Sequence, residues 1–207
     1  MIDLVLPEAR FRFAGALMEM HRDRKAVFVD QLGWSLPAVG SWLEVDQFDD
    51  DFAIYLLARE KERHQGSVRL LPTTRPHMLD TLFADLCPGG VPTGEDIWEI
   101  SRLVTNPRDC VGAAGLKVHR LLALSLVEFA RLNNISRYNL VAEARRVPTL
   151  LAMGWTVHPL GLPASCDGEE LQALQISIDE NSLGQVRRRV RVFEPVLKVK
   201  EDKRWAA

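Results

Sequence analysis

The chain has 207 residues, of which 47% are hydrophobic and 26% are charged, values ordinary for a globular protein with one buried core. With 26 basic and 28 acidic side chains the formal net charge is −2, so no overall charge favours nucleic acid or a membrane surface. The cysteines Cys87, Cys110 and Cys166 form no C-x-x-C pair. The first residues lack the basic and apolar regions typical of a signal sequence, and no apolar run reaches the length of about 18 residues that a membrane span needs. These features predict a cytoplasmic protein with neither a disulfide framework nor a zinc site, folded as a single domain over residues 1–207.

The first half of the chain predicts a broken helix followed by a β-hairpin. Apolar residues recur at helical spacing from Pro7 to about Asp30. Residues 52–58 and 66–72 have the composition of short strands, and Pro72 ends the second of them. The charged segment 60–65 between them is expected to form the turn.

Residues 96–105 predict a further strand in which side chains alternate between two faces. This alternation places Glu99 and Arg102 on opposite faces unless a bulge intervenes.

The second half of the chain alternates between helix and strand. The strongest helix is predicted over 113–133, where an apolar stripe ends at two asparagines. The remaining expected elements are strand 138–143, helix 145–153 ended by Gly154, strand 155–160, strand 171–178 and a polar helix from about Asn181. Mixed strands and helices of this kind predict a layered α/β or α+β sandwich.

The stretch between Arg24 and Asp49 is the most informative about function. It combines a basic residue with two aromatic side chains, Phe28 and Trp34, and with spaced acids. The acids are Glu44, Asp46 and Asp49. Flat apolar surfaces beside carboxylates are a combination that captures an organic cation next to an apolar chain.

Each of these features also has an ordinary structural explanation. Phe28 and Trp34 alone are typical of core or loop-anchoring aromatics, and the acids are typical of a solvated turn. The acids do not match a calcium-binding loop, which needs a glycine at its sixth position and a closing glutamate. Glu99 and Arg102 alone are compatible with a surface salt bridge. The five histidines show no metal-binding spacing and receive no functional assignment.

Four separated motifs in the same order resemble the acyl-homoserine-lactone synthases of the LuxI type. They are Arg24-x3-Phe28-x5-Trp34, Glu44-x-Asp46-x2-Asp49, Gly66-Ser-Val-Arg69-Leu-Leu-Pro-Thr and Glu99-Ile-Ser-Arg102. The later segment 154–161 is similar to the C-terminal half of that family, so the resemblance covers nearly the whole chain. The interval from Trp34 to Glu44 is about one residue longer than the family pattern, a difference that concerns the loop between them.

The resemblance implies a three-layer α-β-α sandwich around a mixed sheet, related to the N-acetyltransferase fold. It also implies a quorum-sensing enzyme that joins S-adenosylmethionine to an acyl thioester. The methionyl amine attacks the thioester carbonyl, and the carboxylate then closes on the γ-carbon, releasing methylthioadenosine and an N-acyl-homoserine lactone. S-adenosylmethionine is a substrate in this reaction, and no cofactor is expected.

The residues of the motifs suit this chemistry. The catalytic candidates are Glu99, Arg102, Arg69 and Asp46, and the substrate-binding candidates are Arg24, Phe28, Trp34, Glu44, Asp46, Asp49, Val104 and Thr105. The acids balance the sulfonium charge, and forked arginines hold the acids or the substrate carboxylate. An α-amino group has a reference pKa of about 7.7 to 8.0, so a modest base, for which Glu99 is the candidate, frees the nucleophile. Backbone amides near Arg69 or between Arg102 and Thr105 are candidates for the oxyanion donors.

The acyl group and its donor are less clearly indicated. The acyl-chain pocket is predicted to include Leu122, Leu126, Ala142, Met153 and Trp155. In the synthases that the chain resembles, a threonine just after a strand valine often accompanies 3-oxo chains. Ala142 is at the corresponding position and lacks the hydroxyl that would hydrogen-bond a 3-oxo group, so the resemblance implies an unsubstituted chain.

Acyl carrier protein is the favoured donor, and it would need a basic surface. Candidates are Lys117, Arg120, Arg137, Arg145 and Arg146. Acyl-coenzyme A remains an alternative donor, because Gly112 and Gly115 precede or open the long helix and backbone amides at such a place bind phosphate.

Two other functions compete with synthase activity. One is an acyltransferase of the same broad fold that uses acyl-coenzyme A and a different amine. The other is a non-catalytic relative, whose mark would be loss of the acids or of Arg24, and all of these residues are present.

Overall fold

The computed structural model describes residues 1–109, 111–166 and 168–198, which divide into two compact units. The first unit comprises Met1–Leu70, Arg102–Ser125 and residues 196–198, and the second comprises Leu71–Ser101 and residues 126–195. Cys110 lies outside the described residues, whereas Cys87 and Cys166 are free thiols. Within the described ranges, no helix has both the length and the apolar character needed to cross a membrane.

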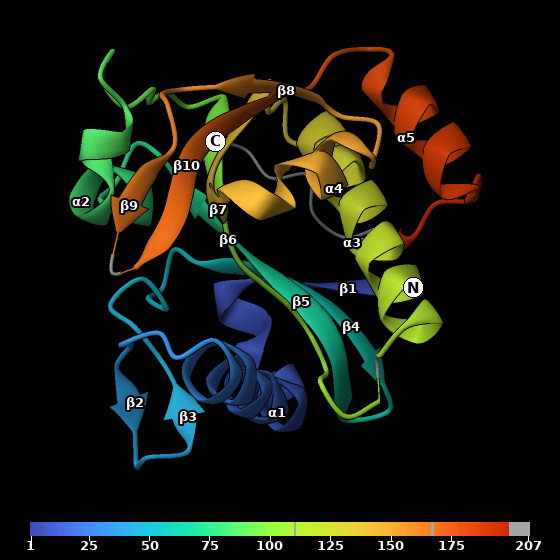
Figure 1. Ribbon diagram of the computed structural model, residues 1–207. Helices are drawn as coiled ribbons and strands as arrows, with labels where there is room; N and C mark the ends of the chain where they lie inside the picture. The colour runs from blue at the N-terminus through green and yellow to red at the C-terminus, as the bar shows by residue number, and fades with distance from the viewer. Residues whose placement is uncertain (110, 167, 199–207) are drawn as a thin grey trace. The chain divides into compact units, whose positions relative to one another are not determined.

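The first unit is built on four strands in the order β11-β1-β4-β5. Their bounds are β11 (Leu197–Lys198), β1 (Ile2–Val5), β4 (Ile54–Glu60) and β5 (Arg63–Pro72). β1 pairs in parallel with β11 and antiparallel with β4, and β4 and β5 form the long antiparallel hairpin visible in Figure 1. The core of this unit includes Leu56 and Val68 from the hairpin, both fully buried.

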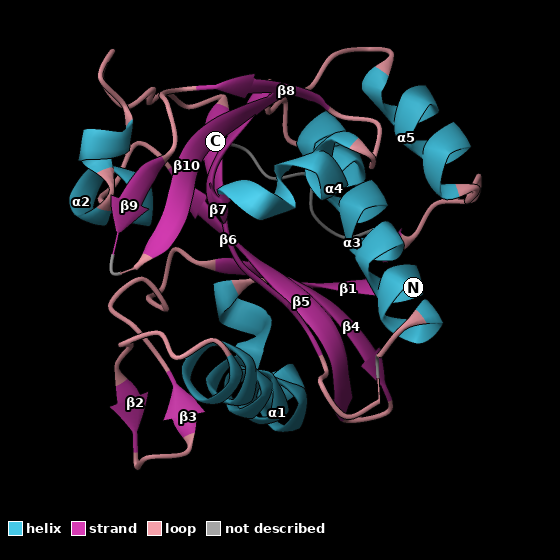
Figure 2. Cartoon of the chain, in the orientation of Figure 1, coloured by secondary structure: helices cyan, strands magenta, loops and turns pink. Residues whose placement is uncertain are grey.

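A continuous helical segment follows β1 in the first unit. It begins as the 3-10 helix η1 (Pro7–Phe13), continues as α1 (Ala14–Arg24) and ends as the π-helix η2 (Lys25–Gln31). A small hairpin of β2 (Ala38–Val39) and β3 (Leu43–Glu44) comes next (Figure 2).

The second unit has strands in the order β6-β7-β10-β8, with β9 paired to β10. Only the part of β6 up to Ser101 belongs to this unit, and its remaining residues, from Arg102 onward, belong to the first. The bounds are β6 (Ile97–Thr105), β7 (Arg137–Glu143), β8 (Thr156–Pro159), β9 (Ala164–Cys166) and β10 (Glu169–Ser177). β6 and β7 are parallel, and the other pairs are antiparallel. Its helices are α2 (Met78–Leu82), η3 (Ala84–Leu86), η4 (Ala144–Arg146), α4 (Val147–Leu151) and α5 (Ser182–Val190). Leu79, Leu86, Cys87 and Ala173 form a buried cluster in this unit.

The long helix α3 (Ala113–Leu132) belongs to the first unit as far as Ser125 and to the second from Leu126 onward. It ends just before Asn134, whose φ of 55° is left-handed, a conformation that asparagine tolerates and that stops a helix. The predicted helix and its asparagine stop are therefore confirmed.

Most other predicted elements are also present, with boundaries that differ by a few residues. The hairpin, the strands β6, β7, β8 and β10 and the final helix were all expected from the sequence. The helix predicted over 145–153 is instead two short helical segments, η4 and α4, because Pro148 allows a helix to begin nearby but not to continue through it. The strands β1 and β11 were not predicted, since each is only a few residues long.

The alternation predicted for 96–105 fails within β6. Ile97 and Glu99 are buried, as a period of two requires, but the next buried residues are Ile100 and Arg102. Arg102 has a left-handed φ of 52°, which interrupts the extended backbone at this position. The burial pattern thus changes phase between Glu99 and Ile100, and Glu99 and Arg102, which strict alternation would place on opposite faces, are both buried.

Gly66 allows a close approach of β5, β6 and α3 within the first unit. A Cβ atom at Gly66 would lie 2.5 Å from Cγ1 of Val118 on α3 and 3.1 Å from the carbonyl oxygen of Val104 on β6. The first distance is shorter than real carbon contacts allow, so any larger residue requires the Val118 side chain or the surrounding backbone to shift.

We predict that Gly66→Ala lowers the free energy of unfolding by about 1–3 kcal/mol, the usual cost of overpacking a core. Urea unfolding followed by circular dichroism measures this change. Gly89→Ala is the matched control, because nothing lies within 4 Å of a Cβ there, and it should shift stability by less than about 0.5 kcal/mol. Equal effects of the two substitutions would contradict the packing argument.

Candidate functional site

Three arginines and three carboxylates form a buried ionic cluster within the first unit. They come from separate places in the chain. One lies at the end of α1, one in strand β3, two in the turn after β3, one in β5 and one in β6. The members are Arg24, Glu44, Asp46, Asp49, Arg69 and Arg102. Their side chains are at most 7% exposed, and one such charge without its partners would be costly to bury.

Arg24 connects two of the acids. Its Nε donates to Oε2 of Glu44, and its two terminal nitrogens donate to the two oxygens of Asp49 at 2.8 and 2.9 Å. This forked geometry fixes both the distance and the plane of the carboxylate. Tyr55 adds a hydroxyl that donates to Asp49 Oδ1 at 2.8 Å.

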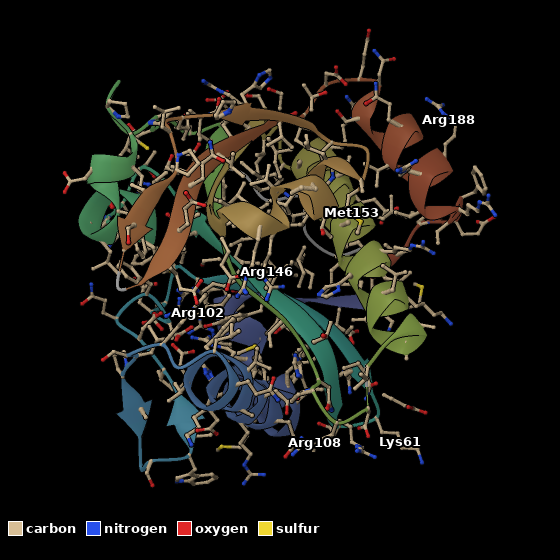
Figure 3. All side chains as sticks on the ribbon, in the orientation of Figure 1. Lys61, Arg102, Arg108, Arg146, Met153 and Arg188 are labelled. Atoms are coloured by element: carbon tan, nitrogen blue, oxygen red, sulfur yellow. The ribbon has the colours of Figure 1, made fainter. Side chains whose placement is uncertain are left out.

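Arg69 and Arg102 complete the cluster around Asp46. Arg69 makes two hydrogen bonds to the oxygens of Asp46, at 2.5 and 3.0 Å. Nη2 of Arg102, which is labelled in Figure 3, lies 2.7 Å from Asp46 Oδ2 and 3.0 Å from Glu44 Oε1. Each of the three acids in the cluster thus contacts at least two arginines.

The arginines keep the buried acids ionised. Burial would raise the pKa of Asp49, but the charges of Arg24 and Arg69 outweigh it and hold that pKa far below its ordinary range. Burial also opposes ionisation of Asp46, and the hydrogen bond and charge of Arg69 lower its pKa on balance.

The three arginines differ in how well their charges are balanced. The pKa of Arg24 is raised, because Asp49 and Glu44 outweigh the effect of burial. Arg102 shows the opposite shift: burial, together with the charges of Arg24 and Arg69, lowers its pKa despite the nearby acids. Arg102 is also the most exposed of the three arginine side chains, at 5% compared with 1% for Arg24 and 0% for Arg69.

A stacked aromatic pair lies against the cluster. The rings of Phe28 and Trp34 are 5.1 Å apart and inclined by 8°, and the guanidinium of Arg102 lies 5.7 Å from the Phe28 ring centre. The π-helix η2 carries Phe28, and the amide of Trp34 donates to the Phe28 carbonyl at 2.9 Å, which closes the segment. A π-helix widens the helical turn and is frequently found at functional sites.

The structure thus brings together all the residues predicted from the first three motifs and Arg102. Within this group, Glu44 is fully buried and both of its oxygens contact arginines, so its geometry is that of a structural anion. Val104 is also buried, and Thr105 is half-buried at the end of β6.

Glu99 lies in the second unit and has a separate environment. Its side chain is 3% exposed, and Oε2 accepts a hydrogen bond of 2.8 Å from the amide of Leu79 in α2. Nε2 of His77 lies 3.8 Å from the same oxygen. Asn139 of β7 is paired with Glu99 in the sheet register. A buried carboxylate with donors arranged on one side is suitable for accepting a proton.

The predicted acyl-chain residues fall in both units. Leu122 belongs to the first unit, and Leu126, Ala142, Met153 and Trp155 belong to the second. The indole nitrogen of Trp155 is buried and makes no hydrogen bond, so it offers a donor to a polar group of a ligand. An open cavity of about 490 Å³ in the second unit is lined by other residues, namely Gly154, Gln185, Arg188 and Arg189.

Two histidines near these groups were not assigned a role from the sequence. His64 is buried between Asp23 and Ser67, at 2.7 and 3.0 Å, and this link connects α1 to β5 beside Arg24 and Arg69. The order Ser-His-Asp matches a hydrolytic triad, but all three residues are at most 1% exposed, so the arrangement is structural. His77 next to Glu99 was missed because nothing in the sequence places it near that carboxylate.

Comparison with known proteins identifies the family to which these features correspond. A family model described as autoinducer synthase matches residues 9–186. The isovaleryl-homoserine lactone synthase of Bradyrhizobium diazoefficiens is 32% identical over 193 residues, covering 92% of this chain and 85% of that protein.

Solved structures agree with this match. BjaI, described as a CoA-dependent acyl-homoserine lactone synthase with SAM and isopentyl-CoA, has a TM-score of 0.88 and 29% identity, with 96% of this chain and 92% of that chain covered. MesI, also described as CoA-dependent, has a TM-score of 0.85 and 28% identity, with 98% and 100% covered. An acyl-CoA N-acyltransferase from Pseudomonas aeruginosa shares the fold at 17% identity and a TM-score of 0.57, with 84% and 99% covered. The predicted α/β fold related to N-acetyltransferases is confirmed.

We predict that Asp49→Asn destabilises the protein by about 3 kcal/mol at pH 7, because two buried arginines lose a charged partner. The lowered pKa of Asp49 means that its contribution is fully present above the unfolded-state pKa of about 3.9 and declines as the pH falls below it. The difference between variant and wild type should therefore be about 1 kcal/mol smaller at pH 3 than at pH 7.

Urea unfolding at the two pH values measures both effects. Asp51→Asn is the control, because the Asp51 side chain is 97% exposed, and this variant should resemble the wild type at both pH values. A destabilisation by Asp49→Asn that does not change with pH would contradict the electrostatic explanation.

Proposed function

Since the chain belongs to the autoinducer synthase family, we propose that its ionic cluster binds S-adenosylmethionine and that Glu99 serves the acyl transfer. The protein is an acyltransferase, an acyl-homoserine-lactone synthase that uses S-adenosylmethionine as a substrate. The amine of this substrate attacks the thioester carbonyl, and the thiol leaves. The substrate carboxylate then attacks its own γ-carbon and expels methylthioadenosine, which leaves the acylated lactone.

The observation that carries this proposal is the position of Arg102, the most exposed of the three arginines, beside a stacked aromatic pair. Burial and the neighbouring arginines lower the pKa of Arg102, so an added anion such as the substrate carboxylate would be stabilised there. Trp34, which is half-buried and stacked on Phe28, offers aromatic surface to a sulfonium cation, which is weakly hydrated and attracted to ring faces.

Among the acids, Asp46 is best placed to face a ligand. Its side chain is 7% exposed, compared with 3% for Asp49 and 0% for Glu44. We assign Asp46 and Arg69 to positioning of the substrate, and Arg24 and Glu44 to holding the cluster together. Val104 and Thr105, at the end of β6, are assigned to the wall of the substrate site.

Glu99 is the proposed general base. It accepts the proton that the substrate amine loses as the amide bond forms, either directly or through one water molecule. The 3% exposure of its side chain favours the route through water, since little of the carboxylate is open to a large substrate.

The identity of the acyl donor is a separate part of the proposal. The sequence favoured acyl carrier protein, but two of the candidate basic residues, Arg145 and Arg146, both donate to Glu143, at 2.8 and 2.7 Å. Their charge is thus partly satisfied within the chain, which weakens the case for an acidic protein partner. Two similar structures are of CoA-dependent synthases. In this chain the long helix α3 begins directly after Gly112, and backbone amides at the start of a helix suit a pyrophosphate. We therefore propose acyl-coenzyme A as the donor.

The acyl group is proposed to be short and unsubstituted. Ala142 carries no hydroxyl for a 3-oxo group, and the relative from Bradyrhizobium is an isovaleryl-homoserine lactone synthase. Leu122, Leu126, Ala142, Met153 and Trp155 are the proposed lining residues.

We predict that the purified protein forms N-acyl-homoserine lactone from S-adenosylmethionine and a panel of acyl-coenzyme A thioesters. Mass spectrometry detects the fragment ion common to all homoserine lactones and gives the acyl chain in the same spectrum. Matched acyl carrier proteins bearing the same chains provide the comparison. Turnover with the carrier proteins alone would overturn the coenzyme A proposal, and no product from either set would favour a different acyltransferase or an inactive relative.

We also predict that Glu99→Gln lowers kcat by about 10² to 10⁴-fold, the usual contribution of a general base, while the protein remains folded. Glu95→Gln is the matched control, because Glu95 is exposed in the same unit and its loss should leave kcat unchanged. Steady-state kinetics with saturating substrates distinguishes the two variants. Wild-type turnover in Glu99→Gln would remove Glu99 from the mechanism.

A further inference from the structure

His77 occupies an unusual position beside the proposed base. It is fully buried in the second unit, at the N-terminus of α2, and forms a capping box with Asp80. A capping residue needs only one acceptor atom, which serine, asparagine or aspartate supplies. A whole imidazole ring also buries a second nitrogen, and a buried nitrogen normally needs a hydrogen-bond partner of its own.

That second nitrogen, Nε2, is buried and makes no hydrogen bond. Leaving a buried polar atom without a partner costs about 1–3 kcal/mol. The ring is oriented so that Nε2 lies 3.8 Å from Oε2 of Glu99. This separation is longer than a hydrogen bond, and such contacts at catalytic sites often tighten only when substrate binds.

The contacts of the other nitrogen constrain where the proton lies. Nδ1 is 2.9 Å from the carbonyl oxygen of Arg75, which can only accept, so this bond places a proton on Nδ1. An ionised Glu99 can also only accept, so a hydrogen bond from Nε2 to this carboxylate would need a proton on Nε2. If Nδ1 instead accepts the Asp80 amide in the capping box, the neutral ring carries its proton on Nε2. In this second arrangement the Nε2–H is directed at the carboxylate of Glu99.

Two carboxylates face the ring from the elements packed around it. Glu99 of β6 faces Nε2, and Asp80 of α2 lies 3.4 Å from Nδ1. Asn139 of β7, opposite Glu99 in the sheet, is uncharged and is engaged with Pro92 and Gln175. The ring therefore lies between two groups that, when ionised, can only accept hydrogen bonds.

We propose that His77 is a positioning residue for Glu99. Its Nε2–H holds the Glu99 carboxylate ionised and oriented, so that this group, and not the histidine, accepts the proton from the substrate amine. The Leu79 amide holds Oε2 from the helix side, and His77 supplies the second donor to the same oxygen. This role rests on the function proposed for Glu99.

Substitutions that separate capping from the Nε2 contact test the proposal. His77→Asn keeps a good capping side chain but is too short to reach Glu99. We expect kcat to fall about tenfold, the acid limb of the pH profile to move to higher pH, and KM for S-adenosylmethionine to change less than twofold. His77→Gln restores an N–H donor on a longer side chain and should recover part of kcat. His158→Asn, at an exposed histidine of β8, is the control and should behave as wild type.

A second measurement does not depend on activity. The ¹⁵N chemical shifts of the histidine-labelled wild-type protein report which ring nitrogens carry protons. A proton on Nε2 of His77 at neutral pH is expected, and an unprotonated Nε2 would overturn the proposal. This result also stands if His77→Asn fails to fold.

The outcomes separate this inference from the proposed function. If Glu99→Gln retains full turnover, the base assignment fails, whereas the NMR experiment still decides whether His77 donates to Glu99. If Glu99→Gln is impaired but His77→Asn has wild-type kcat and an unchanged pH profile, the positioning role is wrong and the proposed function remains.

Discussion

The structure around the candidate site depends on the charge balance of three buried arginines. Each guanidinium would be costly to bury alone, and three carboxylates offset that cost through short, forked hydrogen bonds. Because the partners come from separate parts of the chain, the network also fixes where α1, β5 and β6 meet within the first unit. An ion pair of this kind adds little net stability compared with apolar packing, but it penalises any arrangement that leaves one member unpaired. Specific positioning is therefore its main physical effect.

The sequence predicted the members of this network better than their role. Spaced acids beside aromatic residues indicated a cationic ligand, and all of those residues do lie together. The structure adds that the acids already have arginine partners, with Glu44 fully enclosed. Composition and spacing reveal which charges are available, but the pairing depends on distances that only the tertiary structure fixes. The long helix and the hairpin were predictable because each repeats a local pattern over many residues.

The features that the sequence could not predict share a physical cause. The left-handed conformation of Arg102, the π-helix at Phe28 and the burial of His77 beside Glu99 are all imposed by contacts distant in the chain. Local propensity disfavours the first two, since a non-glycine residue at positive φ and a π-helix are both uncommon. Such exceptions concentrate at functional sites, where the surrounding packing stabilises a conformation that the segment alone would avoid.

The equal number of arginines and carboxylates has a consequence for substrate recognition. A cluster whose formal charges cancel attracts a sulfonium cation weakly through net charge, so the acids alone do not explain selectivity for that ligand. S-adenosylmethionine, however, carries a carboxylate as well as its cation. Arg102, the most exposed of the three arginines, suits the carboxylate, and the adjacent ring of Trp34, stacked on Phe28, suits the cation. Recognition then depends on matching two opposite charges at a fixed separation, which a simple monovalent cation cannot satisfy.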